Sequence, residues 1–313
     1  MVNKRINTTL LVIAALFVGA GQASAAERLK PFELAFTTAN GDMAQIETQV
    51  EQKLTANGFT IVGKYAPYTD MKFPGGAVVS AEVIGVTSPA LKQVASQTEF
   101  GGYAAVQRVT VTKVNNQVQV AYTNPVYMAN AYRLKNNLEG VDTQLKTALG
   151  GEEAYGSNNG LTASSLRDYH YKIFMPYFTD PDKLAAYGSY QEAVNAVNAG
   201  LAAHKGGTSK VYEVAIPGKE QTLFGVALSG PRGNECSGDA YIMSRIDFKD
   251  VKSTGHLPYE ILVSGGKVYA LGAKFRIAIN FPDLSMMGSN SFMSIMCAPG
   301  AIEKALKEAA KGA

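Results

Sequence analysis

Apolar positions in the first third of the chain recur at two different spacings, which predicts a mixture of strands and helices. Residues 32–38 alternate between apolar and polar side chains, as in a strand with one buried face. From Met43 to Leu54 the apolar residues recur every three or four positions, which is typical of an amphipathic helix. Asp42 is placed to cap the start of this helix, and Asn57-Gly58 is placed to end it.

The rest of the first half continues this pattern. Ser88-Pro89 opens a second helix, and Asn124-Pro125 opens a third that runs to Arg133. The predicted strands lie at 59–65, 77–86, 106–114 and 118–122, and the last two form a hairpin about Asn115-Asn116. Hairpins in this order predict a largely antiparallel sheet with helices packed on one face.

Residues 189–313 follow a similar order of elements. We expect helices at 190–204 and 299–310, strands at 211–216, 222–228 and 240–248, and a hairpin about Gly265-Gly266 whose second strand closes at Phe281-Pro282. This recurrence favours an internal duplication with a divergent second copy. The expected fold class is α+β: two small domains at 26–135 and 189–313, each a largely antiparallel sheet with helices on one face. An irregular, aromatic-rich connection at 136–188 joins them.

The N-terminal segment has the pattern of a cleavable signal peptide. Lys4 and Arg5 precede an apolar run, residues 10–18, that is shorter than the about 20 residues needed to span a bilayer. Ala23-Ser24-Ala25 has the small side chains that a signal peptidase requires, so we expect cleavage after Ala25, with a retained anchor as the alternative. No other stretch is apolar for long enough to be transmembrane. The expected location of the protein is the periplasm of a bacterium, with secretion as the alternative.

The charge of the chain limits the classes of partner that we expect, and its cysteine content indicates whether a disulfide forms. The formal net charge is +3, and Lys4 and Arg5 supply two of these charges, so the mature surface is nearly neutral and nucleic acid is not an expected partner. Cys236 and Cys297 are the only cysteines of the chain. In an oxidising compartment two such thiols usually pair, so we expect one disulfide; two thiols too far apart to meet are the alternative.

The first half, about residues 30 to 135, resembles a bacterial family known as domain of unknown function 302. The resemblance rests on the amphipathic helix that ends in Asn57-Gly58-Phe59, on the strand-to-helix junction at 87–91, and on the hairpin followed by residues 122–125 and Met128. It implies a compact α+β domain. It implies no activity and no catalytic residue, because none is established for the family.

The sequence offers few residues with recognisable catalytic or binding spacing. His170, His204 and His256 lack partners at zinc-site spacing, and the glycine pairs match no nucleotide-binding pattern. Haem attached through a C-x-x-C-H motif is excluded. The aromatic stretches could line an apolar pocket, for which the candidate residues are Tyr103, Tyr122, Tyr127, Met128 and His170, with ordinary core packing as the alternative.

A methionine-rich segment near the C-terminus is the most unusual local feature. It contains Met286, Met287, Met293 and Met296, followed by Cys297. Thioether sulfurs are soft donors that suit Cu(I), but methionine also fills irregular cores. The first interpretation is a non-enzymatic exported protein that binds a small ligand or an envelope protein. A copper- or haem-handling protein that uses Met and Tyr side chains is the second, and an enzyme with an unrecognised site is the third; no cofactor is required by the sequence.

Overall fold

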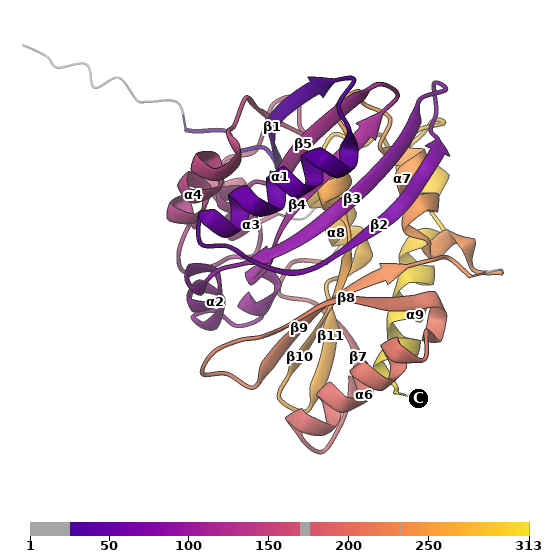
Figure 1. The fold of residues 1–313 in the computed structure, drawn as a ribbon. Coiled ribbons are helices and arrows are strands. Elements are labelled where there is room, and N and C mark those ends of the chain that lie inside the picture. Colours follow the sequence, from indigo (N-terminus) through magenta and orange to yellow (C-terminus); the bar gives the residue numbers. More distant parts are fainter. Residues whose placement is uncertain (1–25, 170–175, 232, 313) are drawn as a thin grey trace, which may run out of the picture.

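The computed structural model describes residues 26–169, 176–231 and 233–312. They form two antiparallel sheets with helices packed on them, which confirms the predicted α+β class. Figure 1 shows the first sheet, drawn in indigo to magenta, crossing above the second, drawn in salmon to orange. Helices α1 and α4 lie against the first sheet, and α6 and α9 lie against the second.

The first half supplies the six-stranded sheet. Its elements are β1 Phe32–Ala39, α1 Met43–Ala56, β2 Thr60–Lys72, β3 Val78–Thr87, α2 Pro89–Ser96, η1 Gly101–Ala104, β4 Gln107–Val114, β5 Gln117–Thr123, α3 Pro125–Ala131, α4 Glu139–Leu149 and β6 Glu153–Tyr155. The short helix α5, Ala163–Arg167, follows. The strand order in the sheet is β2-β3-β4-β5-β1-β6.

The second half supplies the five-stranded sheet. Its elements are β7 Asp182–Ala186, α6 Tyr190–Ala202, η2 Lys205–Gly207, β8 Thr208–Ala215, β9 Gln221–Leu228, η3 Glu235–Ser237, α7 Asp239–Ile246, η4 Thr254–His256, β10 Tyr259–Ser264, β11 Lys267–Ala270, α8 Ala273–Asn280, η5 Phe292–Ile295 and α9 Ala298–Ala310. The strand order is β7-β11-β10-β9-β8.

The two halves share one arrangement. Read from the edge strand inward, β8-β9-β10-β11-β7 has the connectivity of β2-β3-β4-β5-β1. Two α-helices also follow the second strand of the hairpin in each half: α3 and α4 after β5, and α8 and α9 after β11. Gly85 pairs with Arg108 across β3 and β4, just as Gly225 pairs with Glu260 across β9 and β10. Arg108 and Glu260 therefore occupy matching positions in the two halves.

Local chemistry sets the ends of the predicted helices. The Asp42 carboxylate accepts a hydrogen bond from the Gln45 N–H at 3.1 Å, as a cap of α1 should. Gly58 has φ +80°, a left-handed conformation that glycine adopts without strain. Ser88 caps α2 in the same way as Asp42 caps α1, through the N–H of Leu91 at 3.3 Å.

Three predicted segments differ from the structure. Residues 240–248, expected as a strand, form most of α7, because Ile242, Met243 and Ile246 share one buried helical face. The strand expected to run on to Phe281-Pro282 stops at Ala270, and α8 follows. Within 136–188, expected to be irregular, α4 buries an apolar face at Val141, Leu145, Ala148 and Leu149.

Each half covers the open face of the other half's sheet. The η1 segment of the first half packs against β9 and β10, and the η4 segment of the second half packs against β3, β4 and β5. At η4 the Thr254 hydroxyl lies 3.2 Å from the Tyr68 hydroxyl and 3.0 Å from the Thr112 hydroxyl. The apolar residues Val79 and Val83 of β3 consequently belong to the core of the second half.

The two sheets approach most closely where β2 crosses β8. A Cβ atom at Gly63 would lie 1.9 Å from the carbonyl oxygen of Val211, so only glycine fits there. The ring of Tyr212 fills the space beside Gly85 and Gly225. This crossing fixes how the two halves sit against one another.

None of the helices within the described residues is long and apolar enough to span a bilayer.

Candidate functional site

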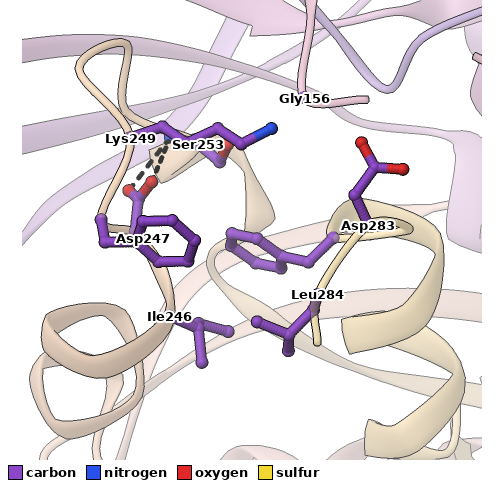
Figure 2. A pocket seen from close by; sticks show the side chains of 9 residues that line it. Gly156, Ile246, Asp247, Lys249, Ser253, Asp283 and Leu284 are labelled. Atoms are coloured by element: carbon purple, nitrogen blue, oxygen red, sulfur yellow. Dashed lines mark hydrogen bonds between the residues drawn. The ribbon is translucent and has the colours of Figure 1, made fainter. Parts of the chain in front are cut away.

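A small pocket opens where the two halves meet at the end of α7. Its cavity volume is about 30 Å³, room for a group of methyl size rather than a drug-sized ligand. Gly156, which follows β6, brings the first half to its edge. The second half supplies the remaining lining residues: Ile246, Asp247, Phe248, Lys249, Ser253, Phe281, Asp283 and Leu284. Figure 2 shows Ile246 and Leu284 on one side of the pocket, with Lys249 and Asp283 on the other.

Asp247 is the buried acid of this pocket. Both of its carboxylate oxygens accept from the N–H of Ser253 at 3.0 Å, drawn as dashed lines in Figure 2. Burial raises the pKa of Asp247 to about 7, although Lys252 and the Ser253 N–H act in the opposite direction. The ammonium of Lys252 is itself buried and donates to the backbone oxygens of Asp247 and Lys249 at 3.1 and 2.6 Å.

Asp283 and Lys249 form a charged rim that is tied to the first half through Asn158. The Asn158 N–H donates to the Asp283 carboxylate at 2.5 Å, and the Lys249 ammonium donates to the Asn158 side-chain oxygen at 3.3 Å. The exposed ring of Phe248 lines the same opening. The opening of the pocket therefore carries the anion Asp283 and the cation Lys249 next to apolar walls.

The raised pKa values of the buried acids predict that the free energy of unfolding falls as pH rises. Asp239, which accepts from Tyr65 and the Leu228 N–H, also has its pKa raised to about 7 by burial. A raised folded-state pKa stabilises the fold fully below about pH 4, and this stabilisation is lost as pH rises through 7. Between pH 4 and pH 8 the unfolding free energy of the wild type should decrease. We expect this decrease to be smaller by roughly 2–4 kcal/mol in the Asp247→Asn protein.

Urea unfolding at both pH values measures this difference. Glu99→Gln removes an exposed carboxylate and serves as the matched control, with the wild-type pH dependence expected. An Asp247→Asn protein that loses as much stability with pH as the wild type would contradict the assignment.

A second polar cluster is buried at the interface between the sheets. Glu260 accepts from Arg108 at 3.3 Å, from Arg276 at 2.5 Å and from the Tyr212 hydroxyl at 2.8 Å. All three charged side chains are at most 2% exposed. Arg276 also donates to the backbone oxygens of His256 and Pro258. Because these groups bond to one another and to backbone, the cluster joins β4, β10 and α8, while the buried Nε atoms of Arg108 and Arg276 have no hydrogen-bond partner.

The tyrosines predicted to line a pocket lie in the main hydrophobic core. Tyr103, Tyr122, Tyr127 and Met128 are at most 1% exposed. The Tyr122 hydroxyl donates to Gly150 O at 2.9 Å, and the Tyr127 hydroxyl donates to Ile279 O at 2.7 Å. They line the core rather than the pocket of Figure 2. His170 lies outside the described residues.

The other two histidines are engaged in local bonds. His256 is buried, its Nε2 lies 3.0 Å from the Tyr259 hydroxyl, and burial together with Arg276 and Arg108 holds its pKa well below the usual range. His204 Nδ1 lies 2.9 Å from the Ser209 hydroxyl. Within the described parts of the chain, no three His, Cys, Asp or Glu side chains are grouped to hold a metal ion.

The predicted disulfide between Cys236 and Cys297 is confirmed, with Cα atoms 5.8 Å apart. Cys297 is therefore not a metal ligand. Its bond ties the segment before α7 to the start of α9.

Sequence reasoning missed Asp247, Asp283, Arg108, Glu260 and Arg276. Glu260 and Arg276 each stand alone within apolar stretches, 259–263 and 275–279, and this is the signal that could have marked them. Asp247 and Asp283 follow helix ends in loops, where an acid is common and carries no such signal.

Residues 35–150 match the family described as "Domain of unknown function DUF302", which confirms the resemblance of the first half. The chain is also similar to the crystal structure of an uncharacterized conserved DUF302 protein from Bacillus stearothermophilus. That match has 16% sequence identity and a TM-score of 0.31, and covers 36% of this chain and 94% of that chain. No curated protein matches this chain.

Proposed function

We propose that this chain, whose residues 35–150 form a DUF302-like region, is an exported periplasmic protein that binds a small ligand and catalyses no reaction. The observation that carries the proposal is the pocket of Figure 2, where opposite charges on Lys249 and Asp283 stand above an apolar floor. The perturbed groups Asp239, Asp247 and His256 all make internal hydrogen bonds, which favours a structural role for them over an acid–base role.

The leader pattern and the disulfide support export. Lys4, Arg5 and the apolar run 10–18 precede the cleavage motif at 23–25. A bridge between Cys236 and Cys297, which are 61 residues apart, stabilises a fold by about 4 kcal/mol in the chain-entropy description. That stabilisation persists in an oxidising compartment and is lost where thiols are kept reduced.

The rim and the walls of the pocket together select a class of ligand. Lys249 suits a carboxylate, Asp283 suits an ammonium group, and the walls at Ile246, Phe281 and Leu284 suit a short apolar group. The cavity volume of about 30 Å³ limits that group to a small one. A zwitterion with a short apolar side chain, such as a small aliphatic amino acid, meets all three conditions.

Thermal unfolding with a panel of small molecules tests this proposal. A ligand that binds only the folded state raises the melting temperature, by the equivalent of about 2.7 kcal/mol at a hundredfold excess over Kd. We expect alanine, 2-aminobutyrate or valine to raise it, and butyrate and butylamine, which each carry one of the two charges, to leave it unchanged. Melting temperatures that do not move with any zwitterion would contradict the proposed ligand class.

Two pocket variants locate the binding. Lys249→Gln and Asp283→Asn each remove one charge, and loss of a charged hydrogen bond of about 1.5–3 kcal/mol weakens binding roughly tenfold to a hundredfold. Lys304→Gln and Glu99→Gln remove exposed charges outside the pocket lining and should bind as the wild type does. Equal binding by all four proteins in calorimetric titrations would place the ligand elsewhere.

A further inference from the structure

The loop between α8 and α9 exposes an unusual amount of thioether surface. Among the described residues, the three most exposed large apolar side chains are Met287, Met296 and Met293, at 78%, 61% and 49%. All three lie within a span of ten residues, 287–296. Core filling, the ordinary use of methionine, does not account for side chains that face solvent.

The backbone brings two of these methionines, Met293 and Met296, together with the partly buried Met286. The Met293 N–H donates to the Met286 carbonyl at 3.2 Å, so residues seven positions apart in the chain are neighbours. Met293 lies in the 3-10 helix η5, and the Met296 N–H donates to the Met293 carbonyl at 3.4 Å. Side chains three residues apart in a 3-10 helix eclipse one another, so Met293 and Met296 share a face.

The segment that carries them is held by several independent contacts. Ile295 is fully buried in the core of the second half. The Ser291 hydroxyl donates to Gly288 O at 2.7 Å, and the Ser294 hydroxyl donates to Ser291 O at 2.6 Å. The disulfide at Cys297 fixes the end of the loop to the segment before α7. A loop restrained in this way presents its side chains with little further loss of entropy on binding.

We propose that Met286, Met293 and Met296 bind one Cu(I) ion on the surface beside the disulfide. Thioethers are neutral, soft and poorly hydrated, so they select Cu(I) over harder divalent ions. Cys297 is oxidised, so the ligand set is thioether only. This site is separate from the pocket of Figure 2 and does not depend on the ligand proposed for it.

Titration of the disulfide-intact mature chain with Cu(I), anaerobically and against a chromophoric Cu(I) chelator, tests the site. We expect the wild type to retain one equivalent of Cu(I) and the triple variant Met286→Leu, Met293→Leu, Met296→Leu to lose it. Leucine conserves volume and apolar character, so the fold should tolerate the changes. Met71→Leu, which alters a thioether on β2, is the matched control and should retain Cu(I) as the wild type does.

Unfolding measurements without copper separate loss of a ligand from loss of the fold. A triple variant that melts like the wild type but no longer retains Cu(I) supports the site, as does sulfur coordination in the X-ray absorption spectrum of the wild-type complex. Equal Cu(I) retention by the wild type and the triple variant overturns the proposal. No retention by the wild type also overturns it, and leaves the exposed methionines as a contact surface for a protein.

Discussion

Replacing Glu260 by Gln is expected to lower the free energy of unfolding by about 3–5 kcal/mol. Glu260 is the single anion between Arg108 and Arg276, and all three side chains are buried. Glutamine keeps the shape and an acceptor oxygen but removes the charge, which leaves two guanidinium groups in the interior without a counter-charge. Because Arg108 belongs to β4 and Glu260 to β10, the substitution weakens the contact between the two halves.

Urea unfolding and the melting temperature report this cost. For a chain of this size the melting temperature should fall by roughly 10 °C, since each kcal/mol corresponds to about 2–4 °C. Glu213→Gln is the matched control: Glu213 pairs with Lys210 at 2.8 Å, and both side chains are at least one-third exposed, so a change within about 0.5 kcal/mol is expected. A Glu260→Gln protein as stable as this control would mean that the cluster does not join the halves.

The first half produced alone, as residues 26–169, is expected not to form a stable monomer. Separation exposes Val79, Ala81 and Val83 of β3, which are at most 1% exposed in the complete chain. Each fully buried valine contributes roughly 1.5–3 kcal/mol through burial. Separation also removes the partner of Arg108, so the isolated half loses apolar burial and an ion pair at once.

Far-ultraviolet circular dichroism and sedimentation of the isolated half measure this outcome. An unfolded or self-associated species is expected, because a second copy is the simplest way to cover the exposed sheet face. The complete chain at the same concentration is the control. A monomeric first half that unfolds cooperatively with the stability of the whole chain would contradict the shared core.

The sequence was most informative where a local signal sufficed. The caps at Asp42, Ser88 and Asn57-Gly58 and the Asn115-Asn116 turn act within a few residues, and the helices and the hairpin form where these signals lie. The disulfide followed from counting cysteines and from the expected compartment. The second half was predicted less completely: the strands at 211–216 and 222–228 and the hairpin about Gly265-Gly266 are present, but 240–248 is largely helical and β7 was not predicted.

Local signals failed for two helices of the second half, α7 and α8. In α8 the apolar residues Phe275, Ile277 and Ile279 alternate as in a strand. All residues of this helix except Lys274 are buried, so the alternation carries no information about its period. In α7 the only buried apolar residues are Ile242, Met243 and Ile246, at helical spacing, and the segment is otherwise rich in residue types that are common in strands.

The candidate site was the hardest part to predict because it depends on the contact between the halves. Asp283 and Lys249 become neighbours of Asn158, which lies 125 and 91 residues away in the chain. Arg108 and Glu260 meet across 152 residues. No spacing rule connects such pairs, and only the topology of the two sheets brings them together.

Calorimetry of residues 26–313 with the disulfide intact tests most directly whether the two halves form one cooperative structure. The pocket and the ion cluster both depend on that structure. The shared core and the reciprocal packing of η1 and η4 predict one endotherm, with a calorimetric enthalpy equal to the van't Hoff enthalpy. Two separate transitions, of which Glu260→Gln lowers neither or only one, would show that the halves unfold independently and would contradict this account.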